Sequence, residues 1–88
     1  MMQIELHKNF EKAFAKLSSK QKQRVKETID LFRLNPFDPQ IRNHPLHGGQ
    51  KGKRAISAGG DLRIIFKEEN DYQKVIFIRV GTHNQVYD

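Results

Sequence analysis

Three of the four histidines lie from residue 44 onward and could carry protons in a reaction. His44 and His47 belong to a turn-rich segment, and His83 follows an apolar stretch later in the chain. The imidazole group has an unperturbed pKa near 6.5, so it can give or take a proton at neutral pH. Each histidine, taken alone, is also compatible with a hydrogen-bonded place on the surface. No helical histidine pair and no nearby thiolate or carboxylate accompanies them, so the sequence predicts no metal site.

Cations and an aromatic ring accompany these histidines. Arg63 follows Asp61 in an apolar stretch, and Tyr87 comes soon after His83. Cleavage of RNA without a metal needs such a set: a base for the ribose 2′-OH, an acid for the leaving 5′-oxygen, cations for the phosphorane and a ring to stack a base. The set indicates a ribonuclease without being diagnostic. The other cations near it are Lys51, Lys53, Arg54 and Arg79.

The composition of the chain favours an anionic partner. The chain has 16 Lys and Arg residues and 10 Asp and Glu residues, which gives a formal charge of +6 and a pI of about 9.8. Nucleic acid or an acidic protein is therefore an expected partner, and the alternative is a basic but inert surface. The absence of cysteine is compatible with a reducing cytoplasm. No segment approaches the roughly 20 apolar residues that span a bilayer, so we expect a soluble, cytoplasmic protein.

A short strand and two amphipathic helices are predicted before residue 36. Residues Gln3–Leu6 alternate between polar and apolar, which suits a half-buried strand. A helical period then begins, with Asn9 as its expected N-cap, and a second helix ends before Asn35 and Pro36. The apolar positions with helical spacing are Phe10, Phe14 and Leu17, and then Val25, Ile29 and Phe32.

The second half of the chain predicts an antiparallel meander. Residues 35–52 hold all three prolines and read as a long connection, and loops of this length in small domains tend to be functional. Three strand signals follow at Lys53–Ala58, Asp61–Lys67 and Tyr72–Val80, separated by two hairpin turns. The β-α-α-β-β-β order predicts one α+β domain over residues 1–88. In it the N-terminal strand and helical hairpin pack on an antiparallel sheet of about four strands.

The strand at residues 61–67 has two different faces. Leu62, Ile64 and Phe66 should face the helices, whereas Asp61 and Arg63 should lie on the opposite face. In an antiparallel meander the beginning of this strand lies beside the end of the next one. We therefore expect the residues around Asp61 and Arg63 to meet those from Arg79 to His83, with Tyr87 close by.

Two segments resemble a known family. HPLHGGQKGKRAISAGGDLRIIFK and RVGTHNQVYD are similar to the RelE/ParE toxin superfamily of type II toxin-antitoxin systems, and most similar to its YafQ-like branch of ribosome-dependent mRNA interferases. The resemblance covers the whole chain in element order. It implies an endoribonuclease that uses 2′-OH attack and no metal or cofactor. It also implies a cognate antitoxin protein and, as substrate, mRNA in the A site of the 30S ribosomal subunit, with contacts to ribosomal RNA.

The resemblance assigns roles to single residues. His44 and His83 match active-site histidines of the branch, and Asp61 matches its active-site aspartate. Tyr87 falls where the family places an aromatic residue that engages the base, which completes the expected catalytic set. Arg63 matches a phosphate-contacting arginine of the wider group. The expected RNA-binding cations are Lys51, Lys53, Arg54, Arg63 and Arg79. The family assigns no role to His47.

One residue departs from the YafQ-like pattern. Ser57 stands where that pattern has a second histidine in the strand after the KG-x-R block. A hydroxyl group cannot carry a proton at neutral pH as imidazole does, so either that histidine is dispensable or Arg63 compensates by stabilising the transition state. Asn84 and Gln85, between His83 and Tyr87, are interpreted as spacers that turn the chain.

Two other functions remain open on the same scaffold. A ParE-like toxin would inhibit DNA gyrase without catalysis, and a degenerate binding module would retain affinity for antitoxin and RNA alone. A gyrase inhibitor would have no need for Asp61, His83 and Tyr87 to converge, so the expected convergence favours the ribonuclease.

Overall fold

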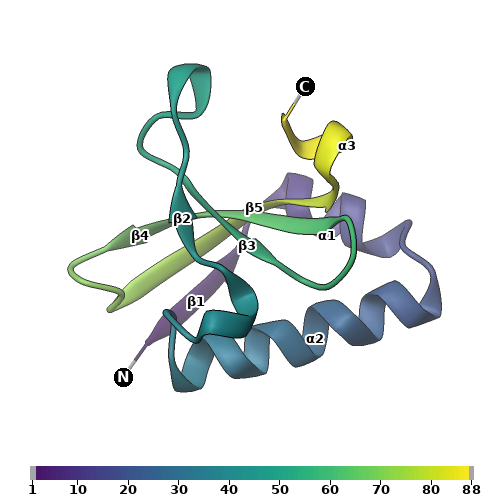
Figure 1. The fold of residues 1–88 in the computed structure, drawn as a ribbon, viewed down its shortest axis with the longest axis horizontal. Coiled ribbons are helices and arrows are strands. Elements are labelled where there is room, and N and C mark those ends of the chain that lie inside the picture. Colours follow the sequence, from purple (N-terminus) through teal and green to yellow (C-terminus); the bar gives the residue numbers. More distant parts are fainter. Residues whose placement is uncertain (1, 88) are drawn as a thin grey trace.

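A five-stranded mixed sheet forms the centre of the computed structural model, which describes residues 2–87. Its strands are β1 (Gln3–Leu6), β2 (His44–Pro45), β3 (Arg54–Ser57), β4 (Leu62–Glu69) and β5 (Lys74–Thr82). The order across the sheet is β1-β5-β4-β3-β2 (Figure 1). The helices are α1 (Lys8–Ala15), α2 (Ser19–Leu34) and the short α3 (His83–Tyr87).

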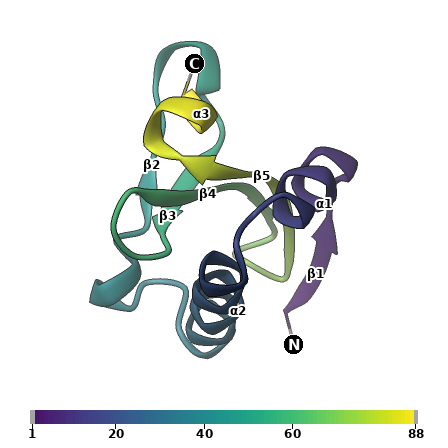
Figure 2. The same cartoon turned by 90° about the vertical axis from the view of Figure 1, so that its right-hand side faces the viewer.

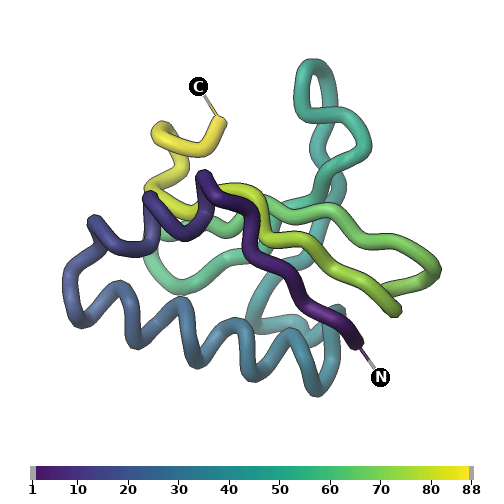
Figure 3. Tube along the Cα trace, turned by 180° about the vertical axis from the view of Figure 1, so that it is seen from behind, coloured from purple at the N-terminus to yellow at the C-terminus, as the bar shows by residue number. Residues whose placement is uncertain are grey.

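The predicted α+β fold is confirmed, with two differences in the sheet. Strands β3, β4 and β5 form the expected antiparallel meander, and β1 covers the residues predicted for it. However, β1 pairs with β5 in parallel, so the sheet is mixed and not wholly antiparallel (Figure 3). A fifth strand, the two-residue β2, arises in the long connection and pairs with β3. It was not predicted, because two residues carry no periodicity.

The helix boundaries follow from their capping residues. Asn9 is not the N-cap of α1: His7 takes that place, and its Nδ1 accepts a hydrogen bond from the Asn9 backbone N–H at 3.0 Å. Ser18 caps α2 in a reciprocal capping box with Gln21, whose backbone and side chain each make a bond of 3.1 Å to it. As predicted, α2 ends before Asn35, which is its extended C-cap residue and precedes a proline.

The main core lies between the sheet and the helices α1 and α2, which both cover one sheet face (Figure 2). Leu62, Ile64 and Phe66 are buried in it, as the alternation in this strand predicted. The Phe32 ring of α2 packs edge-on against Phe66 and Phe77, with centroids 5.0 and 5.6 Å away. This aromatic contact fixes the helical layer on the sheet and leaves the other sheet face available.

A β-bulge in β5 decides which residues reach that other face. Ile65 pairs with Arg79 but Phe66 pairs with Phe77, so Ile78 is an extra residue on β5. The inward residues therefore change phase, from Val75 and Phe77 to Val80. Arg79, which would point into the core of a regular strand, lies on the face opposite to the helices as a result.

No helix within residues 2–87 has the length and apolar character needed to cross a membrane.

Candidate active site

A small second core holds α3 on the face opposite to α1 and α2. Ala55 of β3, Ile65 of β4 and Val86 of α3 are buried together there, with Leu46 and Tyr87 packed against them. Because neighbouring β-strand residues point to opposite faces, Ile65 contacts this cluster while Ile64 and Phe66 lie in the main core. This cluster is the apolar surface on which α3 packs.

Reciprocal hydrogen bonds shape the start of α3. The Thr82 backbone N–H donates to Gln85 Oε1 at 2.9 Å, and the Gln85 backbone N–H donates to Thr82 Oγ1 at 3.4 Å. Arg79 Nη2 also donates to the Gln85 carbonyl oxygen at 3.0 Å. Gln85 is therefore a capping residue, and the interpretation of it as a spacer was wrong. Gly81 leaves room for it, because a Cβ there would lie 2.7 Å from Gln85 Oε1.

An open pocket of about 270 Å³ lies beside α3. The strand register explains its composition: Ser57 pairs with Arg63, Arg63 pairs with Gly81, and His44 pairs with Ala55 on the same sheet face. The backbone N–H of His83 donates to the Asp61 carbonyl oxygen at 2.9 Å, which joins α3 to the start of β4. The lining residues are Arg42, His44, Ser57, Arg63, His83 and Tyr87.

A backbone contact determines the tautomer of the His44 ring. Its Nδ1 lies 2.8 Å from the carbonyl oxygen of Arg42. A carbonyl oxygen can only accept, so Nδ1 must carry the hydrogen, and in the neutral ring Nε2 then holds a lone pair. Arg42 itself has a left-handed backbone with φ of 52° at the end of a short 3₁₀ turn. This turn brings both the Arg42 side chain and the His44 ring to the pocket.

His83 and Tyr87 pack against each other across one turn of α3. Their ring centroids are 4.4 Å apart, at an interplanar angle of 73°. Burial raises the pKa of the Tyr87 phenol, and the positive charge of Arg63 partly opposes this. The phenol therefore keeps its proton at neutral pH, and Tyr87 presents an aromatic surface to the pocket.

Three hydrogen bonds hold the guanidinium group of Arg63 in place, and one of its own nitrogens, Nη1, donates all of them. Nη1 donates to Ser57 Oγ at 3.2 Å, to the Gly60 carbonyl at 2.9 Å and to the Leu62 carbonyl at 3.0 Å. Within residues 2–87 the side chain of Arg63 donates no other hydrogen bond. Its Nε and Nη2 atoms can therefore donate to an anion. Ser57, in the place where a histidine was expected, acts here as an acceptor that orients Arg63.

Two predicted site residues have their side chains outside the pocket. Asp61 is exposed and meets the site through its backbone carbonyl, not through its carboxylate. Arg54 alternates with Ala55 and so lies on the helix-facing side of β3. There its Nε donates to Asn43 Oδ1 at 2.8 Å, and its guanidinium group lies 5.7 Å from the centroid of the Phe37 ring.

The remaining predicted cations are also apart from the pocket, and one pocket residue was missed. Lys51 is exposed in a turn, whereas Lys53 and Arg79 line a separate groove. Arg42 was not predicted, because it has a left-handed backbone in the turn before β2, where neither strand nor helix periodicity gives a signal. The structure thus joins His44, Arg63, His83 and Tyr87 of the nine predicted residues.

Comparisons with known proteins agree with the resemblance in the sequence. The family described as "Bacterial toxin of type II toxin-antitoxin system, YafQ" matches residues 2–88. The crystal structure of YafQ from E. coli BL21(DE3) superposes with a TM-score of 0.80 at 26% identity, and that of the E. coli DinJ-YafQ complex with 0.78 at 26%; both cover all of each chain. A metal-bound toxin from Helicobacter pylori is 25% identical, with a TM-score of 0.71 over 99% of this chain and 100% of that one.

Not every comparison gives a relative. No curated protein sequence matches the chain. Residues 2–87 contain no group of three or more His, Cys, Asp or Glu side chains arranged to hold a metal ion. The family match nevertheless spans nearly every residue, and the chain belongs to the YafQ family of bacterial type II toxins.

Proposed function

We propose that this toxin is a ribosome-dependent mRNA endonuclease. The observation that carries the proposal is the pocket in which His44, Arg63, His83 and Tyr87 meet. Two proton carriers, an oriented cation and an aromatic ring are the groups that RNA cleavage without a metal requires. Membership of the YafQ family supports the same reaction.

The geometry supports a division of roles between the two histidines. His44, with Nδ1 bonded to the Arg42 carbonyl, has Nε2 available to take the proton from the ribose 2′-OH. The 2′-oxygen then bonds to the adjacent phosphorus while the bond from phosphorus to the 5′-oxygen breaks. His83 in its protonated form gives a proton to that leaving oxygen. The products are a 2′,3′-cyclic phosphate and a free 5′-OH, and solvent exchange restores both imidazoles.

The other pocket residues stabilise and position the reacting groups. Arg63 offers Nε and Nη2 to the non-bridging oxygens of the phosphorane, and Arg42 adds a second positive charge. Tyr87 provides a stacking surface for a base splayed out of the mRNA. Asp61 is a positioning residue in this mechanism, since its carbonyl oxygen holds the backbone N–H of His83.

The proposed partners follow from the reaction and from the related complex. DinJ and YafQ of E. coli form a complex, and we expect this toxin to be bound by a cognate antitoxin in the same way. The formal charge of +6 favours an acidic antitoxin and also favours contact with ribosomal RNA. Translating ribosomes would place the activity in the cytoplasm.

The decisive experiment compares cleavage with gyrase inhibition. Purified toxin should generate new mRNA ends bearing 5′-OH groups in a translation reaction, and no such ends on the same mRNA without ribosomes. Supercoiling by DNA gyrase should be unaffected in a parallel assay. Inhibited supercoiling with intact mRNA would overturn the proposal in favour of the ParE-like alternative.

A further inference from the structure

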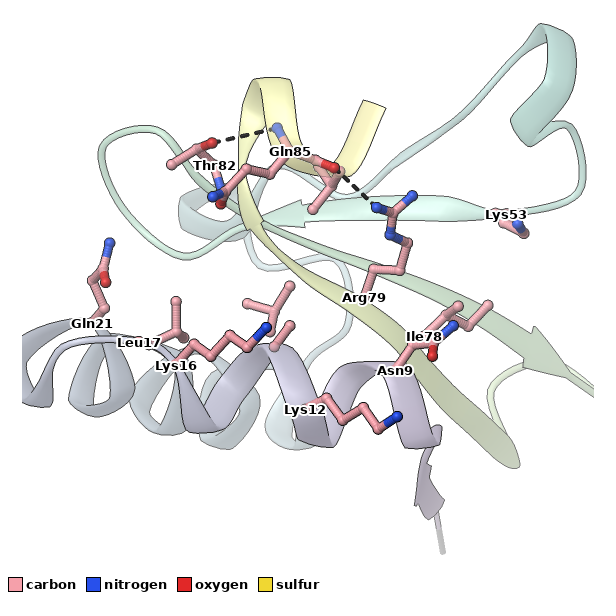
Figure 4. A pocket seen from close by; sticks show the side chains of 13 residues that line it. Asn9, Lys12, Lys16, Leu17, Gln21, Lys53, Ile78, Arg79, Thr82 and Gln85 are labelled. Atoms are coloured by element: carbon pink, nitrogen blue, oxygen red, sulfur yellow. Dashed lines mark hydrogen bonds between the residues drawn. The ribbon is translucent and has the colours of Figure 1, made fainter. Parts of the chain in front are cut away.

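The two histidines of the pocket depend on different supports. His83 is the first residue of α3. Hydrogen bonds from Gln85 to Thr82 and from Arg79 to Gln85 fix the first turn of that helix (Figure 4). His44 has no helix beneath it, since it follows the long connection and begins the two-residue strand β2. The position of its ring therefore depends on the residues around it in the connection.

Asn43 stands directly before His44 but does not line the pocket. The residues before and after it both do, whereas the Asn43 side chain is half-buried and makes its bonds elsewhere. Its Nδ2 donates to the carbonyl oxygen of Pro36 and to the hydroxyl oxygen of Tyr72, both at 3.0 Å. Its Oδ1 accepts from Nε of Arg54 at 2.8 Å. The start of the connection, β3 and the turn after β4 thus meet at one amide group.

The amide group of Asn43 has one orientation that satisfies these partners. The carbonyl oxygen of Pro36 can only accept, and Nε of Arg54 can only donate. The amide nitrogen must therefore face Pro36, and the amide oxygen must face Arg54. Both hydrogens of Nδ2 then have an acceptor. An aspartate of the same shape would lack the donor that the Pro36 carbonyl needs.

The Tyr72 partner of Asn43 is itself fixed in the core. Its ring packs edge-on against Phe37, with centroids 5.4 Å apart, and lies 6.0 Å from the ring of Phe32. Its backbone is left-handed, with φ of 68°, and its backbone N–H donates to Glu68 Oε1 at 3.0 Å. Such a backbone is uncommon for a bulky residue and persists where the surroundings fix it. The Tyr72 hydroxyl is therefore a firmly placed acceptor.

An anchored Asn43 fixes the backbone contact of the His44 ring. The peptide bond that joins Arg42 to Asn43 is planar, so the position of Asn43 limits where the Arg42 carbonyl oxygen points. That oxygen lies 2.8 Å from His44 Nδ1. Arg42 has a left-handed backbone with φ of 52°, which is uncommon for a residue other than glycine. Without the anchor, Arg42 could return to a right-handed backbone and turn its carbonyl away from the ring.

We propose that Asn43 is a positioning residue of the active site, which holds the Arg42 carbonyl so that the His44 ring keeps its hydrogen on Nδ1. This role rests on the proposed function, in which His44 is the general base. In water the neutral imidazole of histidine prefers the opposite tautomer, with the hydrogen on Nε2. A ring without the carbonyl contact would therefore carry a hydrogen on the atom that has to take one from the 2′-OH.

The test follows the tautomer of His44 and the rate of cleavage in three variants. Asn43→Ala removes the amide, Tyr72→Phe removes one of its acceptors and keeps the ring, and Asn35→Ala is the matched control. Asn35 lies in the same connection, where its Oδ1 accepts from the Phe37 backbone N–H at 3.0 Å, and it does not line the pocket. Long-range ¹H–¹⁵N spectra at about pH 8, where imidazole is neutral, report the tautomer without ribosomes. Urea unfolding shows which variants are folded.

The wild type should show the Nδ1–H tautomer at His44. Asn43→Ala should move the ring mainly to the Nε2–H tautomer and lower the single-turnover rate on saturating ribosomes by at least about tenfold, because a displaced base loses its alignment. Its affinity for ribosomes should stay unchanged, which a general loss of structure would not allow. Tyr72→Phe should change the tautomer and the rate in the same direction but by less. Asn35→Ala should keep the wild-type tautomer and rate even if its stability falls.

Three results would overturn the role of Asn43. These are the Nε2–H tautomer in the wild type, an unchanged tautomer or rate in folded Asn43→Ala, or an equal change in Asn35→Ala. If Asn43→Ala does not fold, Tyr72→Phe decides, and wild-type values in that variant would overturn the role. The expected tautomer change in a toxin whose wild type cleaves no mRNA would support the placement of His44 by Asn43 and overturn the proposed reaction instead.

Discussion

His44 and His47 lie in the same loop but in different environments. His44 lines the pocket with Nδ1 fixed by the Arg42 carbonyl, whereas His47 is exposed and does not line it. His44→Gln should therefore lower the rate of ribosome-dependent cleavage by at least about 100-fold, because general base catalysis contributes a factor of about 10² to 10⁴. Single-turnover cleavage on programmed ribosomes would measure it.

The matched control is His47→Gln, which should cleave at the wild-type rate. Both variants should unfold at the same urea concentration as the wild type, since both side chains are exposed. Full cleavage by His44→Gln would remove His44 from the mechanism and leave the base to be found among the other pocket residues.

Tyr87 contributes a ring and not a proton. Its raised pKa keeps the phenol protonated at any pH below its ordinary value of about 10. Tyr87→Phe should therefore retain near-normal cleavage, with a pH profile that superimposes on that of the wild type from about pH 6 to 9. Tyr87→Ala should lower cleavage by an amount equivalent to about 1 to 3 kcal/mol of stacking energy.

One result for these two variants would contradict the role of Tyr87 as a stacking ring alone. If Tyr87→Phe were as impaired as Tyr87→Ala, or lost one limb of the pH profile, the hydroxyl would have a chemical role.

At the scale of elements, the position of α3 depends on Gly81. A Cβ at this position would lie 2.7 Å from Gln85 Oε1 and 3.2 Å from Gln85 Cβ, so the capping bonds between Gln85 and Thr82 could not form unchanged. Gly81→Ala should destabilise the fold by about 1 to 3 kcal/mol, as overpacking does. It should also lower cleavage, because α3 carries His83 and Tyr87. Urea unfolding and cleavage measured on the same samples would show both effects.

Gly49→Ala is the control for that substitution. No heavy atom lies within 4 Å of a Cβ built at Gly49, and its backbone is not left-handed. Its stability and activity should match the wild type. Normal cleavage by a destabilised Gly81→Ala variant would show that the position of α3 does not limit the reaction.

Local patterns in the sequence predicted most elements but not how they join. The apolar spacing in α2, the proline after it and the alternation in β4 depend on neighbouring residues, and the structure agrees with each. The bulge at Ile78 and the pairing of β2 with β3 depend on contacts between distant segments. Periodicity along the chain cannot show contacts between distant segments. Arg79 was therefore predicted in the site, whereas in the structure it donates a hydrogen bond to α3.

The candidate site was predictable where residue type carried the information. His44, His83 and Tyr87 stand out by their chemistry, and the antiparallel meander places His83 beside Arg63. Arg42 was missed, because its left-handed backbone in a connecting segment gives no pattern. The position of the Asp61 carboxylate outside the pocket depends on how the turn before β4 closes, which the sequence does not reveal.

For the molecule as a whole, most Lys and Arg side chains of residues 2–87 form no ion pair. Among residues 2–87 only one ion pair forms between side chains, Lys74 with Glu5, at 3.5 Å. The exposed face of α2 carries Lys20, Arg24 and Lys26. In the function proposed above these cations would contact the phosphates of ribosomal RNA, and binding to phosphates releases counterions.

The affinity of the toxin for ribosomes should therefore fall steeply with salt. The logarithm of the dissociation constant should rise linearly with the logarithm of the KCl concentration, measured by co-sedimentation with His83→Gln so that the mRNA stays intact. Replacing Lys20 and Lys26 with Ala should reduce the slope by about one for each phosphate that the variant no longer neutralises. Replacing Lys74 with Ala should not, because that lysine already pairs with Glu5. A slope that is flat in the parent, or equal in both variants, would mean that ribosome binding does not depend on the basic face of α2.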